Sequence, residues 1–359
     1  MLLGNTLFIN ANHPEATGAA VISDRNYLMI KENSQSAQRI RIDIALKDIR
    51  SNWISLFFKF NLVSNVDLER ISEIVSSKEI NTIFLDNSMF GNFAANLKTQ
   101  YPSIRIITFF HNVEQSYFRE LIKVSKKLYH YFTLALVRRA EKQAACYSNF
   151  TITLNRRDAD EIKHLYNRQV ELILPTSFVD DYQIEQSNPP STDDKLILLF
   201  VGSYFPPNIF GIEWFIEKVM PIVKRNIVVF VVGNGFELHK PKKATRAVNF
   251  IGKVDSIQQF YNKADLVIAP IFHGSGMKTK VAEALMYNRP IIGTNESFEG
   301  YDVNISQIGF RCNTPAEFAN AIESFQRDKL SGIRDVFLKN YTFEATLEKF
   351  TNFLKAGYE

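Results

Sequence analysis

The residues best suited to chemistry lie in the stretch APIFHGSGMKTKVAEALMY, residues 269–287. The spacing predicts a strand that ends at Pro270, a glycine-containing loop over 274–276, and a helix that begins near Met277. Glycine lets a backbone approach a ligand closely, and the unpaired N–H groups at a helix start favour a phosphate. The stretch therefore predicts an anion-binding site at the end of a strand.

Two lysines and a glutamate occupy the first turns of this predicted helix. Lys278 and Lys280 oppose the helix dipole, so an anionic ligand explains them better than helix stability does. The alternative is a lysine pair on a solvated helix face. Glu283 stands in an apolar run, where an inward carboxylate needs hydrogen-bond donors such as the vicinal hydroxyls of a ribose. The alternative is a surface glutamate that pairs with Lys280.

Strand-length apolar runs alternate with helical patterns along the whole chain. A first set comprises NTLFINA, QRIRIDIA, TIFLDNS, RIITFFHN, FTITLN and VELILPT, and a second comprises KLILLFVGS, NIVVFVVGNG, VNFIG, ADLVIAPI and RPIIGT. This βαβ rhythm is typical of parallel sheets covered by helices on both faces. With 359 residues, the chain is long enough for two such lobes.

The polar stretch at 180–195, with Pro189 and Pro190, is the expected linker. We therefore predict an N-terminal Rossmann-like domain over 1–185, a second over 186–340, and a closing C-terminal helix over 341–359 that packs back toward the N-terminal domain. Ligands bind beyond the carboxyl ends of open parallel sheets. The expected fold class is thus α/β, with two doubly wound domains facing a central cleft.

Composition excludes several classes of protein. No apolar stretch reaches the roughly 20 residues of a membrane span, and a net charge of +4 does not call for a nucleic-acid partner. Cys146 and Cys312 lie far apart without a metal-binding motif, so buried thiols are expected. Residues 1–10 are typical of a first strand rather than a signal peptide, which predicts a cytoplasmic protein.

The C-terminal half resembles a known family. The segments VGSYFPPN, VNFIGKV, ADLVIAP and GSGMKTKVAEALMYNRPIIGT are similar, in order and spacing, to those of the family-four retaining GT-B glycosyltransferases. The similarity is greatest to bacterial members that build capsule, O-antigen or other surface polysaccharides. It implies transfer of a sugar from a nucleotide diphosphate sugar to an acceptor hydroxyl, with retention of configuration.

The resemblance also implies roles for individual residues. Glu283 would hold the donor ribose, and Lys278 and Lys280 would act on the leaving diphosphate. The implied donor-binding residues are Gly202, Ser203, Asn208, Gly233, Gly235, Ile251, His273, Gly274, Ser275, Gly276, Met277 and Glu283. Two departures stand out. Ser275 occupies the place of a glutamate found in many members, and Pro206 and Pro207 stand in a region where many members carry basic residues.

The N-terminal lobe offers candidates for the acceptor side. His111 follows an expected strand end and is followed by Asn112 and Glu114; similar HNVE segments occur in the family, near the reacting centre. We expect His111 to act in catalysis by hydrogen bonding to a sugar or to the incoming hydroxyl. The alternative is a histidine that satisfies local backbone groups. His13 and Gly18 resemble a loop that approaches both substrates, although an ordinary loop explains them equally well.

Retention of configuration in this family does not need the paired carboxylates of most glycoside hydrolases. No DxD motif stands at a strand end, so we predict no metal and no cofactor. The stretch from Arg119 to Lys142 is basic and rich in aromatic residues, and WISLFFKF at 53–60 adds apolar surface. Both favour peripheral contact with an anionic membrane at its inner face, where a saccharide or lipid-linked acceptor would be met. A solvated basic helix beside a buried helix is the alternative.

Two other functions fit the same architecture. A nucleotide-sugar 2-epimerase would need further acid and base groups, which the sequence does not show. A catalytically silent partner subunit is suggested by Ser275 at the glutamate position. Turnover of the donor would distinguish a transferase from the silent protein.

Overall fold

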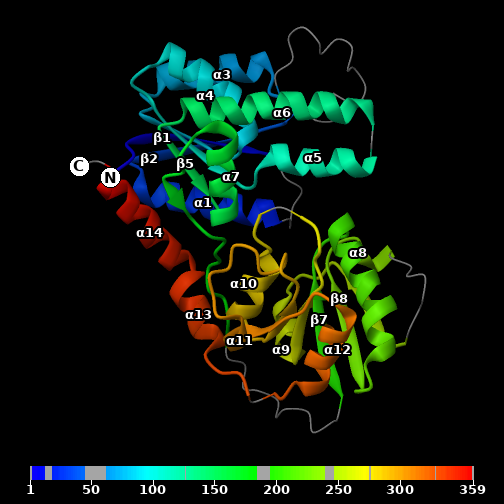
Figure 1. Cartoon of the computed structure of the whole chain (residues 1–359). Coiled ribbons are helices and arrows are strands. Elements are labelled where there is room, and N and C mark those ends of the chain that lie inside the picture. The colour runs from blue at the N-terminus through cyan, green and yellow to red at the C-terminus, as the bar shows by residue number, and fades with distance from the viewer. Residues whose placement is uncertain are drawn as a thin grey trace. The chain divides into compact units, whose positions relative to one another are not determined.

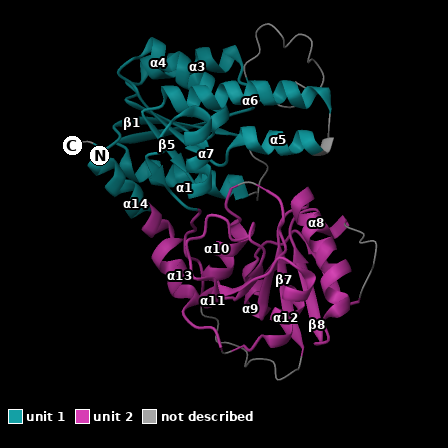
Figure 2. Cartoon of the chain, viewed as in Figure 1, with its two compact units in different colours: residues 1–175, 347–359 teal, residues 176–346 magenta. Residues whose placement is uncertain are grey.

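The computed structural model describes residues 2–12, 18–44, 62–125, 127–183, 195–238, 246–274, 276–327 and 329–357. The chain forms two compact units (Figure 2). Unit 1 comprises Met1–Pro175 and Leu347–Glu359, and unit 2 comprises Thr176–Thr346. The division falls at 175, earlier than the boundary expected at 185. Most of the expected linker, 184–194, lies outside the described residues.

Unit 1 contains a six-stranded parallel sheet in the order β2-β1-β3-β4-β5-β6. Its strands are β1 (Asn5–Ala11), β2 (Ser36–Ile42), β3 (Thr82–Leu85), β4 (Arg105–Phe110), β5 (Phe150–Thr153) and β6 (Leu172–Ile173). The central strands are buried on both faces, which explains their continuous apolar runs.

Helices cover both faces of this sheet (Figure 1). They are α1 (Gly18–Asn33), α3 (Asn65–Ser77), α4 (Gly91–Gln100), α5 (Glu114–Ser125), α6 (Leu128–Tyr147) and α7 (Arg156–Tyr166), with a 3-10 turn at Ser88–Phe90. Because strand side chains alternate, Leu7 and Ile9 join the core under α3 and α4, whereas Phe8 contacts Tyr27 of α1 on the opposite face.

Unit 2 contains a second six-stranded parallel sheet, in the order β12-β11-β10-β7-β8-β9. Its strands are β7 (Leu196–Val201), β8 (Ile227–Val232), β9 (Val248–Gly252), β10 (Leu266–Ala269), β11 (Ile291–Gly293) and β12 (Gly309–Arg311). The sequence analysis did not predict β12. The strand order reverses between β7 and β10, and in doubly wound sheets ligands bind at such a reversal, beyond the carboxyl ends of the strands.

The helices of unit 2 are α8 (Pro206–Trp214), α9 (Gln258–Lys263), α10 (Thr279–Met286), α11 (Ile305–Ile308), α12 (Pro315–Ser324) and α13 (Ile333–Asn340). A π-helical segment, Phe215–Val219, continues α8, and 3-10 turns lie at Met220–Ile222 and Phe236–Leu238. A core cluster packs α8, its π-helical continuation and α12 against one face of the sheet.

The last helix, α14 (Phe343–Ala356), begins in unit 2 and ends in unit 1. Within unit 2, Thr346 Oγ1 lies 2.7 Å from Ser177 Oγ. Within unit 1, Thr351 Oγ1 donates to Asn33 Oδ1 at 3.1 Å, and the rings of Phe353 and Phe150 contact edge to face. The residues of α14 that belong to unit 1 are therefore held by specific contacts in that unit.

Candidate functional site

The candidate donor site lies at the strand-order reversal of unit 2. Gly202 and Ser203 follow β7, and the loop 270–278 follows β10. The helix expected near Met277 begins at Thr279 instead, because Gly276 has a φ of 63° and Lys278 keeps an extended backbone at the N-cap. Lys278 therefore precedes the helix rather than lying in its first turn.

Glycines after β7 and β8 allow two loops to touch through their backbones. Gly233 has a φ of 149°, and a Cβ there would lie 1.9 Å from the carbonyl oxygen of Gly202. A Cβ on Gly235 would lie 2.6 Å from the Cβ of Tyr204. Close packing of the two loops therefore requires both glycines, whether or not a ligand binds there.

Lys280 is buried, with only 7% of its surface exposed. The alternative that Lys280 lies on a solvated helix face is therefore wrong. Its Nζ donates to Asn208 Oδ1 at 2.9 Å and lies 4.2 Å from the ring centroid of Phe200. The pKa of Lys280 is lowered to about 7, chiefly by burial; Glu283 opposes the shift and Lys278 adds to it. An anion beside Lys280 would favour the charged ammonium.

Lys278 makes an ion pair within the same region. Its Nζ lies 2.6 Å from Glu296 Oε1 and donates to the carbonyl oxygen of Gly276 at 3.0 Å. The side chain is only 11% exposed. Glu296 follows β11 and was not a predicted site residue, because its contact with Lys278 joins segments that are distant in sequence.

Glu283 lies on α10, partly buried, and is held by an aromatic pair. Its Oε2 accepts a hydrogen bond of 3.0 Å from the hydroxyl of Tyr261, and the Tyr261 ring stacks on Tyr287 at a centroid distance of 4.6 Å. Burial raises the pKa of Glu283, while the Tyr261 bond and Lys280 act against this shift. A carboxylate fixed in this way is oriented to accept from further hydroxyl groups.

The remaining predicted donor residues have the following places. Asn208 is on α8, Ile251 is on β9, and His273, Gly274, Gly276 and Met277 belong to the loop between β10 and α10. His273 and Gly274 are exposed, whereas Gly276 and Met277 are buried. Ser275 lies outside the described residues.

On the acceptor side, His111 and Asn112 follow β4, and Glu114 begins α5. Gly18 begins α1, and His13 lies outside the described residues. The imidazole Nε2 of His111 lies 3.3 Å from Oδ1 of Asp86, which follows β3 and is completely buried. The sequence analysis missed Asp86, although its place directly after an apolar strand was a usable signal.

Glu141 of α6 is fully buried, although it belongs to the basic segment from Arg119 to Lys142. Its carboxylate accepts from the backbone N–H groups of Glu114 and Gln115, at 2.8 and 2.9 Å, and from the hydroxyl of Tyr166 at 2.8 Å. It thereby satisfies N–H groups at the start of α5. Burial raises the pKa of both Glu114 and Glu141.

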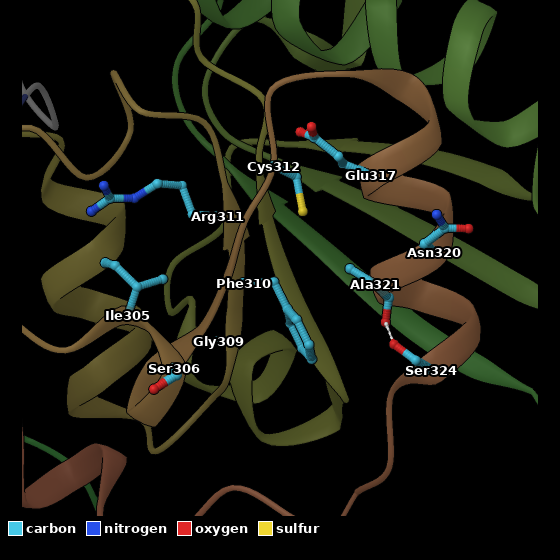
Figure 3. A pocket seen from close by; sticks show the side chains of 10 residues that line it. All are labelled: Ile305, Ser306, Gly309, Phe310, Arg311, Cys312, Glu317, Asn320, Ala321 and Ser324. Atoms are coloured by element: carbon cyan, nitrogen blue, oxygen red, sulfur yellow. Dashed lines mark hydrogen bonds between the residues drawn. The ribbon is translucent and has the colours of Figure 1, made fainter.

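A hollow on the surface of unit 2 does not coincide with these residues. A hollow of about 550 Å³ lies beside β12 and α12 (Figure 3). It is lined by Ile305, Ser306, Gly309, Phe310, Arg311, Cys312, Glu317, Asn320, Ala321 and Ser324. None of the predicted site residues lines it. The chemistry of the side chains, rather than the volume, therefore identifies the candidate site.

The described residues also bear on metal binding and membrane insertion. Within the described ranges, no cluster of three or more His, Cys, Asp or Glu side chains is arranged to hold a metal ion. Among the helices that the structure describes, none has the length and apolarity needed to cross a membrane.

Residues 195–328 match the family model of the group 1 glycosyl transferases. An "Uncharacterized 44.6 kDa protein in cps region" of Klebsiella pneumoniae is 22% identical over 295 residues, which cover 76% of this chain and 72% of that protein.

Two solved structures resemble the whole chain. The sucrose-phosphate synthase of Thermosynechococcus elongatus has a TM-score of 0.72 at 13% identity, with 99% of each chain covered. Anabaena Alr3699/HepE in complex with UDP-glucose has a TM-score of 0.68 at 12% identity, with 98% of this chain and 99% of that chain covered. The chain thus has the GT-B fold, and its segment 195–328 is similar to the group 1 glycosyl transferases.

Proposed function

We propose that this chain is a retaining glycosyltransferase that moves a sugar from a nucleotide diphosphate sugar to an acceptor hydroxyl during assembly of a bacterial polysaccharide or glycolipid. One observation carries the proposal: Lys280, Lys278 and Glu283 gather at the strand-order reversal of a unit that matches group 1 glycosyl transferases. The Klebsiella relative in a cps region agrees with polysaccharide assembly.

In this proposal, the two lysines neutralise the charge that develops on the departing diphosphate, and Glu283 binds the ribose. The complex of Anabaena Alr3699/HepE with UDP-glucose supports a nucleotide sugar as the donor. Lysines and backbone N–H groups take the place of a divalent ion. Turnover should then persist in excess EDTA, and a loss that magnesium or manganese restores would contradict this site.

His111, a residue of unit 1, contacts the sugar or the incoming hydroxyl of the acceptor. Retention then needs no carboxylate nucleophile from the protein, because the donor phosphate takes the acceptor proton as the new bond forms. The helices α5 and α6 carry the exposed basic residues Lys123, Arg138 and Arg139 and the exposed Leu128, and Lys127 at the N-cap of α6 is exposed as well. They support peripheral contact with an anionic membrane, where a lipid-linked acceptor is available.

A thermal-shift screen with UDP, GDP, ADP and dTDP tests the donor class. A ligand at 100 times its dissociation constant adds about 2.7 kcal/mol of stability, which raises the melting temperature of a unit of this size by roughly 5–11 °C. The nucleotide that stabilises the protein selects the donors to be tested for turnover. Stabilisation by none of the four would contradict nucleotide binding, and binding without turnover or hydrolysis would contradict catalysis.

A further inference from the structure

A group of polar side chains is buried at the carboxyl ends of β3 and β4 in unit 1. Asp86 has no exposed surface, Asn26 has none, and Arg25 is 4% exposed. Asn26 Nδ2 donates to Asp86 Oδ1 at 2.6 Å. Burying a carboxylate is costly unless it is paired, so a structure that keeps Asp86 here needs a compensating interaction.

Arg25 provides part of this compensation. Its guanidinium attracts Asp86, donates to the carbonyl oxygen of Pro175 at 2.7 Å and lies 5.7 Å from the ring centroid of Phe109. Burial lowers the pKa of Arg25 to about 9, and Asp86 counteracts that shift. The pair therefore places the Asp86 carboxylate beside a guanidinium in a setting from which water is largely excluded.

The same carboxylate faces His111. Nε2 of the imidazole lies 3.3 Å from Asp86 Oδ1, and the ring packs edge to face against Phe109 at a centroid distance of 5.0 Å. This contact is longer than the Asn26 bond and lacks the geometry of a hydrogen bond in the free protein; catalytic contacts of this kind often tighten only when substrate binds. An ionised carboxylate accepts hydrogen bonds and donates none, so it favours the tautomer with the proton on Nε2.

We propose that Asp86 is a positioning residue for His111: it fixes the imidazole ring in the Nε2–H tautomer, in which Nδ1 is the acceptor nitrogen. The inference rests on the proposed function and deepens it by naming how His111 is prepared. Asp86 acts through the imidazole and is not itself a group that touches substrate.

Nitrogen NMR of the full-length protein without substrate tests the tautomer. At a pH where His111 is neutral, Nε2 should carry the proton and Nδ1 should have the shift of an unprotonated nitrogen. A proton on Nδ1 in the wild-type protein would overturn the proposal. This measurement needs no donor or acceptor, so its failure is distinguishable from a failure of the proposed glycosyl transfer.

The matched variant is Asp86→Leu combined with Arg25→Met, which removes the acceptor without leaving an unpaired guanidinium. His111 should then populate both tautomers. Ser88→Ala is the control, because Ser88 is equally buried but donates to Glu141. An unchanged tautomer in the folded double variant would overturn the proposal. If this variant does not fold, Asp86→Ala combined with Arg25→Met removes the same acceptor with a smaller side chain.

Turnover gives a second readout once a donor is identified. The double variant should lower kcat about 10- to 1,000-fold with little change in the donor KM, since the tautomer matters chiefly during transfer. In a His111→Ala background the same substitutions should have almost no further effect. Fully additive losses would show that Asp86 acts only on the stability of the fold.

Discussion

Lys280 combines burial with a cationic side chain at the candidate donor site. Its pKa of about 7 means that the free protein holds Lys280 only partly charged near neutral pH. A bound diphosphate would favour the charged form and raise this pKa. Nucleotide binding should therefore be coupled to uptake of a proton.

Calorimetric titration at pH 8 tests this coupling in buffers that differ in ionisation enthalpy. We expect uptake of nearly one proton for each nucleoside diphosphate bound, and an affinity that falls by up to about tenfold per pH unit above pH 7. Lys280→Met should abolish the uptake, whereas Lys224→Met changes an exposed lysine and should not. A binding heat that is independent of buffer would contradict contact between Lys280 and the diphosphate.

Glu283 and Tyr261 give a graded test of ribose binding. Glu283→Ala removes charge-assisted hydrogen bonds worth roughly 1.5–3 kcal/mol, so the donor KM should rise about 10- to 100-fold with a smaller change in kcat. Tyr261→Phe only removes the bond that orients the carboxylate and should raise KM about fivefold. Tyr101→Phe, in unit 1, is the control. Equal effects of Tyr261→Phe and Glu283→Ala would contradict the orienting role.

Lys278 and Lys280 should differ from Glu283 in their kinetic effect. The charge that they neutralise grows as the glycosidic bond breaks, so Lys278→Ala or Lys280→Ala should lower kcat by about 100-fold or more. Steady-state kinetics with the identified donor provides the measurement. Folded variants of both lysines with wild-type kcat would show that the leaving group is stabilised elsewhere.

The sequence was informative about some of these residues and silent about others. Lys280 and Glu283 follow a glycine loop at fixed spacing, and such local patterns can be read directly. Asp86, Tyr261 and Glu296 contribute through contacts with residues far along the chain. Their roles depend on tertiary packing, which a single sequence does not specify.

At the scale of elements, the basic segment forms two helices. The chain forms α5 (Glu114–Ser125) and α6 (Leu128–Tyr147), which pack along each other (Figure 1). Leu128 is 62% exposed and Tyr131 is 51% exposed. A surface with exposed lysines and apolar side chains suits an anionic lipid interface.

Vesicle sedimentation tests this surface. Each basic residue near an anionic membrane contributes about 1 kcal/mol, so Lys123→Glu with Lys127→Glu should weaken binding to phosphatidylglycerol-containing vesicles by at least about tenfold. Nucleotide affinity should stay unchanged. The control pair Lys224→Glu and Lys263→Glu makes the same charge change in unit 2. Equal binding by both double variants would place the membrane contact elsewhere or exclude it.

At the scale of the whole molecule, the alternation of apolar runs and helical patterns was enough to predict two doubly wound units. The strand order within each sheet was not available from that rhythm, because parallel strands pair through long connections. The strand β12 has only three residues and thus gave no periodic signal. The passage of α14 from unit 2 to unit 1 depends on contacts such as Phe150 with Phe353.

Buried ionisable groups predict that the two units respond oppositely to pH. In unit 1, the pKa values of Glu114 and Glu141 are raised. At pH values above the usual pKa range of carboxyl groups, the folded state therefore binds more protons than the unfolded state. Stability of unit 1 should then fall as pH rises toward neutral and slightly beyond. In unit 2, the pKa of Lys280 is lowered from 10.5 to about 7. Between these two pH values the unfolded state therefore binds more protons than the folded state. Stability of unit 2 should rise across that interval.

Differential scanning calorimetry between pH 5 and pH 9 measures both slopes, because each unit has a core of its own and should give its own transition. One proton of difference changes stability by about 1.4 kcal/mol per pH unit, which corresponds to roughly 3–6 °C in melting temperature. Glu141→Gln should reduce the fall of the melting temperature of unit 1 with rising pH. Lys280→Met should reduce the rise of the melting temperature of unit 2 with pH and should stabilise unit 2 near neutral pH. Slopes of the same sign in the wild-type protein, or slopes that survive both substitutions, would show that other groups control the pH response.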